Sequence, residues 1–164
     1  MTMKINLFAC CLTLFGLVSG VAQAESGAPA IPLRFLSPEL ATKAVVTAVE
    51  DCTERGYKVS AALVDRAGNL AAFLRAPLSG PHTIEVAQRK AYSAATFQVA
   101  TSQMSSRSDL SFAPGVLLII GGVPINAGGH FYGGIAVSGA EPKIDEECAQ
   151  TGVDAITETL EFAD

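Results

Sequence analysis

Three stretches of the chain carry apolar residues at spacings of three and four, the pattern of helices that bury one face. The first begins after Ser37-Pro38, an N-capping serine followed by a proline at the first helical position, and it ends at Gly56. The second runs over about residues 82–99, where the inward positions are mostly small, and the third spans about residues 142–162. The pattern therefore predicts three amphipathic helices.

Shorter apolar runs lie between the predicted helices, and their lengths favour β-strands. Residues 57–64 and 70–74 flank an Asp-Arg-Ala-Gly-Asn sequence of turn-forming residues, so these two runs predict a β-hairpin. Residues 116–120 predict a buried strand that the following Gly-Gly pair ends, and residues 131–138 predict another strand. Helices and strands in this order predict an α+β domain in which helices cover an antiparallel sheet.

The first 24 residues have the parts of a secretory signal peptide. Lys4 supplies a positive charge, a nearly continuous apolar run follows, and Ala22-Gln23-Ala24 places small residues before a cleavage point. The apolar run is shorter than the roughly 20 residues that span a bilayer, which disfavours the alternative of an uncleaved anchor. We therefore expect a cleaved signal over residues 1–24, a flexible leader over residues 25–35, a domain over residues 36–164, and a periplasmic or extracellular protein.

Composition and charge narrow the classes of protein that this chain can be. Hydrophobic residues make up 49% of the chain, which is too many for a disordered protein, and the length of 164 residues fits one domain. Lys and Arg number 11 against 16 Asp and Glu, and they form no basic patch in the sequence. This balance argues against nucleic acid as a partner, because its binders carry clustered positive charge.

Four cysteines are present, and two of them, Cys10 and Cys11, lie in the predicted signal peptide. The remaining pair, Cys52 and Cys148, is too small for a four-ligand zinc site and does not form a C-x-x-C motif. In an oxidising compartment two such cysteines can form a disulfide. Two buried thiols are the alternative.

The start of the second predicted helix holds most of the candidate chemistry. After a Gly-Pro pair, one helix edge carries His82, Thr83, Glu85, Arg89 and Lys90, which together supply an imidazole, a hydroxyl, a carboxylate and two cations. The simpler interpretation is a helix cap by the threonine and a solvated glutamate–arginine pair at i, i+4 spacing. No P-loop, dinucleotide-binding, nucleophile-elbow or zinc-protease motif occurs in the chain.

From about residue 36 onwards the sequence resembles the HbpS/GlcG-like family of extracellular haem-binding proteins. The resemblance lies in segments that occur in the family's order and spacing: Val-Asp-Arg-Ala-Gly-Asn-Leu at 64–70, Gly-Pro-His-Thr-Ile-Glu at 80–85, Arg-Lys-Ala-Tyr at 89–92, Gly-Gly-Val-Pro-Ile at 121–125, Gly-Gly-Ile-Ala-Val-Ser-Gly-Ala at 133–140 and Asp-Glu-Glu-Cys-Ala at 145–149. The resemblance implies a profilin-like, three-layer α-β-α fold with an antiparallel sheet of about five strands. It also implies a homo-oligomer, often an octamer.

The resemblance further implies a site for haem and its iron. In the haem-binding members the threonine of the Gly-Pro-x-Thr stretch lies at the iron, and Thr83 occupies that position here. His82 precedes it, and an imidazole is the stronger haem ligand, so either residue is a candidate. Arg89 and Lys90 would pair with the haem propionates, and Glu85 lies on the same edge.

The functions implied by the family differ among its members. Secreted members bind haem, and some degrade it oxidatively, store the released iron or signal to a membrane sensor kinase. The sequence alone leaves two alternatives open: a non-haem enzyme for a small carbonyl or hydroxy-acid compound, with Lys90, His82 or Glu85 as acid or base, and a purely structural or signalling oligomer. The implied fold places the first and last helices on one side of the sheet, which favours a Cys52–Cys148 disulfide.

Overall fold

The computed structural model describes residues 30–163. The predicted signal peptide and the leader residues 25–29 lie outside these described residues. The chain divides into two units at Pro32 and Leu33, and the second of them contains all the helices and strands below. Among residues 30–163, no helix has the length and apolar character that crossing a membrane requires.

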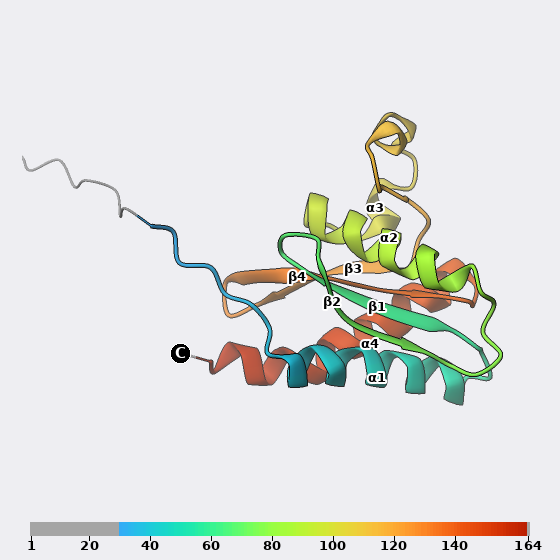
Figure 1. Ribbon diagram of the computed structural model, residues 1–164, viewed down its shortest axis with the longest axis horizontal. Helices are drawn as coiled ribbons and strands as arrows, with labels where there is room; N and C mark the ends of the chain where they lie inside the picture. The colour runs from blue at the N-terminus through green and yellow to red at the C-terminus, as the bar shows by residue number, and fades with distance from the viewer. Residues whose placement is uncertain (1–29, 164) are drawn as a thin grey trace, which may run out of the picture. The chain divides into compact units, whose positions relative to one another are not determined.

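A four-stranded antiparallel sheet forms the middle layer of the domain (Figure 1), with strand order β2-β1-β4-β3. Its strands are β1 (Ser60–Asp65), β2 (Leu70–Arg75), β3 (Gly122–Ala127) and β4 (His130–Ser138). β1 pairs with both β2 and β4, so β2 and β3 are the two edges of the sheet.

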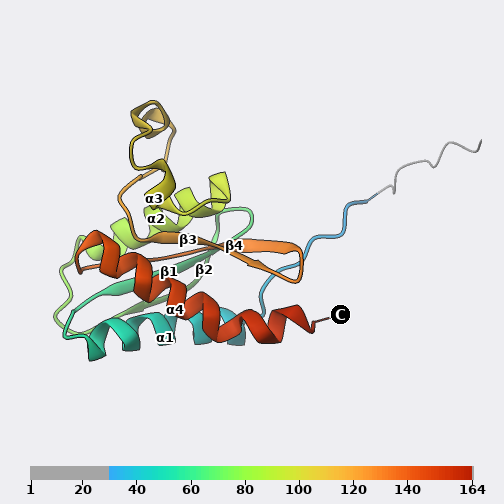
Figure 2. The same ribbon diagram turned by 180° about the vertical axis from the view of Figure 1, so that it is seen from behind.

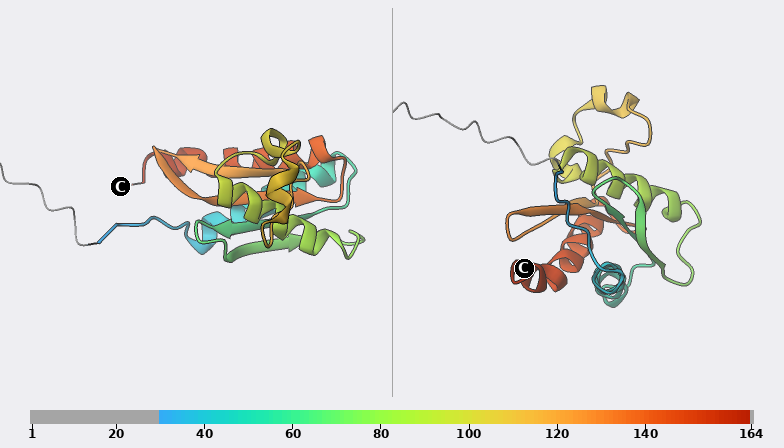
Figure 3. Two further views of the ribbon diagram at one scale, coloured as in Figure 1. Left: turned by 90° about the horizontal axis from the view of Figure 1, so that it is seen from above. Right: turned by 60° about the vertical axis from the view of Figure 1, so that its left-hand side comes forward.

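Helices cover both faces of this sheet. α1 (Pro38–Glu54) and α4 (Pro142–Glu161) lie side by side on one face, whereas α2 (Thr83–Phe97) and the short α3 (Thr101–Met104) lie on the other (Figures 1 and 2). A 3-10 turn, η1 (Ser108–Phe112), follows α3 and stands away from the layers (Figure 1, and the right-hand view of Figure 3). The structure therefore confirms the predicted three-layer α+β architecture.

The first and last helices, α1 and α4, begin with the sequence features that predicted them. The side chain of Ser37 accepts a hydrogen bond from the Leu40 amide at 3.3 Å and so caps α1, and both α1 and α4 have proline in the first turn. The inward faces of these two helices and the sheet enclose the larger apolar core, in which Leu63, Ile135 and Ile156 are fully buried.

α2 lies close to its face of the sheet because the residues between the helix and the sheet are small. The residues of α2 that face the sheet are mainly alanines, and they pack over β1 and β4. At Gly134 of β4, a β-carbon would lie 2.5 Å from the Ala91 carbonyl oxygen, so a side chain there would push the helix away. The small-residue pattern of the second predicted helix thus sets the spacing between these two layers.

Two details of the predicted sheet are wrong. The sheet has four strands, whereas the family resemblance implied about five. The apolar run at residues 116–120 forms no strand, and β3 starts at Gly122, within the glycine pair that was expected to end one. The backbone of this apolar segment bonds to α2 side chains instead of a neighbouring strand: the Leu117 amide donates to Ser93 Oγ at 2.7 Å, and Arg89 donates to the Val116 carbonyl at 3.0 Å. Of residues 116–120 only Val116 is buried, and Ile119 is exposed, so the apolar composition of this run does not mark a strand in the core.

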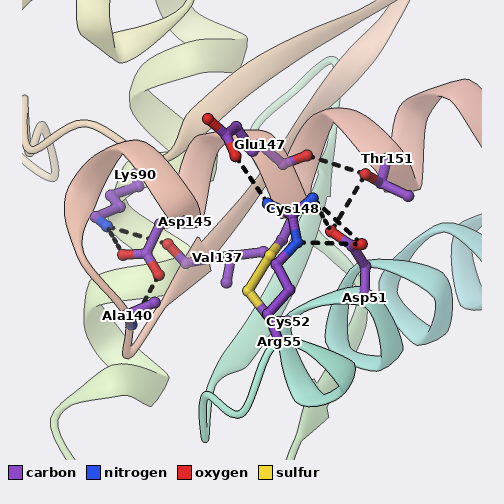
Figure 4. Close-up of a disulfide and its surroundings, with 10 residues drawn as sticks. All are labelled: Asp51, Cys52, Arg55, Lys90, Val137, Ala140, Asp145, Glu147, Cys148 and Thr151. Atoms are coloured by element: carbon purple, nitrogen blue, oxygen red, sulfur yellow. Dashed lines mark hydrogen bonds and ion pairs between the residues drawn. A yellow bond between two sulfur atoms is a disulfide. The ribbon is translucent and has the colours of Figure 1, made fainter.

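The predicted disulfide is present between Cys52 of α1 and Cys148 of α4 (Figure 4). Both cysteines are fully buried, as their inward positions on the two helices predicted. Beside the disulfide, Arg55 bridges Asp51 of its own helix at 2.9 Å and Glu147 of α4 at 2.7 Å. The two helices on this face are thus joined covalently in the core and electrostatically at the surface.

Candidate functional site

His82 ends the loop that leads into α2 and is exposed at the N-terminal end of the helix. Its side chain makes no capping hydrogen bond to the helix backbone. The ring lies over Gly80, where a β-carbon would come within 2.7 Å of its Cε1 atom. The glycine therefore makes room for an imidazole that is turned out of the core.

Thr83, the next residue, is buried with 1% of its surface exposed. Its hydroxyl lies 2.7 Å from Ser60 Oγ and 2.8 Å from Ser79 Oγ, and it donates to the Gly80 carbonyl at 2.6 Å. These contacts tie the loop before α2 to the first residue of β1. The hydroxyl that the resemblance places at iron is thus engaged in hydrogen bonds inside the domain.

Lys90 forms a buried ion pair with Asp145, two turns along α2 from His82 (Figure 4). The ammonium donates to Asp145 Oδ2 at 2.8 Å and to the Val137 carbonyl at 3.0 Å, while Asp145 Oδ1 accepts from the Ala140 amide at 3.0 Å. Burial lowers the pKa of Lys90 and raises the pKa of Asp145, and the attraction between the two groups opposes both shifts.

The internal pair differs from the expected role of Lys90 as a propionate partner. The sequence pattern places Lys90 near Arg89 on one helix edge, but the lysine side chain turns toward the sheet while the arginine remains half-exposed. Because the ammonium already has a carboxylate and a carbonyl as acceptors, a propionate would have to displace Asp145. Asp145 was not predicted as a site residue; its signal in the sequence is an acidic residue on the inward stripe of α4.

Arg89 and Glu85 form the exposed i, i+4 pair of the simpler interpretation, with 3.5 Å between Nη1 and Oε1. The guanidinium also donates to the Val116 carbonyl. Arg89 lines a hollow of about 230 Å³ together with Tyr92 and Gly115, and the Lys90–Asp145 pair does not line it. The five predicted site residues are therefore not gathered around one cavity.

A second hollow, of about 260 Å³, lies beside the N-terminal half of α2 and is here called the His82 hollow. Its lining includes His82 and the Lys90–Asp145 pair, with apolar walls from Val86 and Ile119. Its volume is just below the range of about 300–1,000 Å³ that encloses small-molecule ligands. A flat ligand the size of a haem would lie over this hollow rather than inside it.

The donor set fits haem in part. An exposed imidazole is the commonest protein ligand of haem iron, and apolar walls beside it suit a porphyrin face. Arg89 is exposed and can reach an anionic group, whereas Lys90 cannot without breaking the buried pair. Among the described residues, no cluster of three or more His, Cys, Asp or Glu side chains could hold a bare metal ion.

Comparison with known proteins gives one family. A family model described as "Haem degrading protein HbpS-like" matches residues 36–154. The crystal structure of HbpS is 37% identical, with a TM-score of 0.75, and the match covers 81% of this chain and 98% of HbpS. A double mutant of HbpS from Streptomyces reticuli is 36% identical, with a TM-score of 0.75 and coverage of 81% and 94%.

A further match is the crystal structure of a PduOC:heme complex, which is 26% identical with a TM-score of 0.70 and covers 75% of this chain and 96% of PduOC. No curated protein matches the chain.

Proposed function

Because the chain belongs to the HbpS-like family, we propose that it is an exported haem-binding protein and that His82 supplies the ligand to the haem iron. The observation that carries the proposal is the exposed imidazole at the start of α2, directed away from the core and standing at the rim of an apolar-walled hollow. The relatives named for haem, HbpS-like proteins and the PduOC:heme complex, support the choice of ligand.

His82 is favoured over Thr83 on the contacts that each residue makes. Thr83 would have to leave Ser60, Ser79 and Gly80 before its hydroxyl could reach an iron outside the subunit. His82 has no capping bond to lose. Thr83 then acts as a positioning residue, since its hydroxyl contacts hold the loop that presents the imidazole.

In this proposal Arg89 pairs with a haem propionate, and Lys90 does not. The Arg89 side chain is 41% exposed, and the Val116 carbonyl and Glu85 hold the guanidinium near the outer edge of α2. A guanidinium pairs with a carboxylate through two parallel hydrogen bonds, which orients the ligand as well as attracting it. Glu85 has a supporting role, because it positions the arginine and does not contact the ligand.

A bound haem would supply a redox-active iron, and the residues of this chain would bind it, orient it and control the access of water and oxidants. Oxidative haem degradation, iron storage and signalling to a membrane sensor kinase are the functions that follow from the family resemblance. Each of them requires haem binding first, so binding is the property to test.

Haem titration followed in the Soret band tests the proposal. We expect His82→Ala to shift the Soret maximum of the complex and to weaken binding, because the iron loses its imidazole ligand. His130→Ala is the matched control, since it removes an exposed histidine at the first residue of β4.

Two further variants separate the roles of the neighbouring residues. Arg89→Glu should raise the dissociation constant with an unchanged Soret maximum, because the charge change does not touch the iron. If Thr83→Val abolishes binding while His82→Ala has no effect on spectrum or affinity, the iron ligand is the threonine. If neither substitution matters, haem binds elsewhere and the proposed site is wrong.

A further inference from the structure

An apolar hollow of about 300 Å³ lies between α1, the edge strand β2 and the loop that follows β2. Val49 of α1, Leu74 of β2, and Ala76, Pro77 and Leu78 of the loop form its walls. We call it the α1–β2 hollow. It shares no lining residue with the His82 hollow, so an inference about it is independent of the proposed haem site.

Two cations, Lys58 and Arg75, line this otherwise apolar hollow. Both side chains are exposed, and none of the five ion pairs within residues 30–163 involves either of them. Arg75 donates to the Ser79 carbonyl, which fixes one side of its guanidinium against the loop. In a protein with 11 Lys and Arg against 16 Asp and Glu, two cations without acidic partners at one apolar hollow indicate an anionic ligand.

Leu78, which lines the same hollow, has an unusual backbone conformation. Its φ angle of 67° lies in the left-handed region, which bulky side chains rarely adopt. This conformation belongs to the turn from Ala76 to Ser79, in which the Ser79 amide donates to the Ala76 carbonyl at 3.2 Å and Pro77 precedes Leu78. The turn leaves the Leu78 side chain 88% exposed beside the hollow, where a bound apolar chain could contact it.

We propose that the α1–β2 hollow binds an amphipathic carboxylate, such as a medium-chain fatty acid. The hydrocarbon chain occupies the apolar walls and the carboxylate lies at the hollow's edge between Lys58 and Arg75. Leu78 closes over the chain, which gives its exposed side chain an apolar partner. The volume is at the lower end of the range for small-molecule sites, which suits a short chain and excludes a large ring system.

Titration calorimetry with decanoate and decanol tests the charge requirement. The two probes have the same hydrocarbon chain, and only decanoate can pair with the two cations. We expect decanoate to bind and decanol to bind about tenfold more weakly or worse. Equal affinity for the two probes, or no decanoate binding up to about 1 mM, would overturn the proposal.

Variants locate the binding. Lys58→Gln/Arg75→Gln should weaken decanoate binding about tenfold or more, while Lys43→Gln/Lys143→Gln, which removes the same charge from exposed positions outside the hollow, should leave it unchanged. Circular dichroism of each variant checks that it is folded. An equal loss in both double variants would show attraction by overall charge only, and it would overturn the assignment.

Two more outcomes are diagnostic. His82→Ala should leave decanoate affinity unchanged, because the two hollows are separate, so the haem proposal and this one can fail independently. Leu78→Ser should weaken decanoate binding. If decanoate does not bind and Leu78→Ser instead lowers the mass measured by light scattering, the hollow is a contact between copies of this chain and the ligand proposal is wrong.

Discussion

Lys90 and Asp145 are charged side chains that the fold removes almost completely from water, with 2% and 3% of their side-chain surfaces exposed. Each is acceptable in the core because the other is there, along with the Val137 carbonyl and the Ala140 amide. Their burial also depends on Gly121, where a β-carbon would lie 2.6 Å from the Lys90 ammonium nitrogen. At the scale of single residues, this pair has the strongest consequence for stability.

We expect Asp145→Asn to lower the free energy of unfolding by about 3–5 kcal/mol, because it leaves a buried ammonium without a counter-charge. Lys90→Met/Asp145→Asn should recover most of this loss. The side-chain oxygen of the introduced asparagine can still accept a hydrogen bond from the Ala140 backbone N–H, and no charge remains buried. Chemical denaturation of the three proteins measures both values. A loss below about 1 kcal/mol in Asp145→Asn would contradict the pair's role.

Leu78 permits a second test at this scale, based on its left-handed backbone. Leu78→Gly and Leu78→Ala remove the same exposed side chain, but only glycine removes the β-carbon that makes the conformation unfavourable. We expect the glycine variant to be about 1 kcal/mol more stable than the alanine variant. Thermal or chemical unfolding compares them, and equal stabilities would show that the loop relaxes to another conformation.

At the scale of elements, α1 and α4 form one unit because the Cys52–Cys148 disulfide joins them over 96 residues of sequence. We expect the free energy of unfolding of Cys52→Ala/Cys148→Ala to be about 3–5 kcal/mol lower than that of the oxidised protein, because an unfolded chain without the cross-link has more conformational entropy. A thiol reductant should reproduce this loss in the wild type and leave the double variant unaffected. Labelling of two cysteines in denatured, unreduced protein would show that they do not pair.

How far sequence predicts these elements depends on whether the signal is local. α1, the β1–β2 hairpin and α4 carry caps, turn residues and periodic apolar faces within their own segments, and all three were predicted. Residues 116–120 were assigned to a strand because an apolar run looks the same beside a helix as inside a sheet. Likewise, the sequence does not show that Lys90 has a partner 55 residues away.

Whether a site residue could be predicted also depends on whether its signal is local. His82 could be predicted as an outward residue, because it begins a helix after Gly-Pro. The separation of Arg89 from the Lys90–Asp145 pair could not, since it depends on which way two adjacent side chains turn around α2. The cysteine pair was predictable because both residues fall on apolar stripes of helices that the implied fold places together.

At the scale of the whole molecule, the family resemblance predicts a homo-oligomer. The small volume of the His82 hollow gives such an oligomer a role in haem binding. A hollow of about 260 Å³ covers only part of a porphyrin, so a second subunit would be needed to enclose the remainder. We expect light scattering to give a mass several times the chain's. A mass at or below the 17.0 kDa of the full chain would contradict this and leave the haem bound at an open surface.

The disulfide also determines what happens to a damaged molecule. The segment that stands away from the layers, which includes η1, lies inside the loop that Cys52 and Cys148 close. A protease that cuts the chain in this segment would leave two fragments still linked through α1 and α4. The nicked protein would migrate as one molecule on a non-reducing gel, and only a reductant would separate its two pieces.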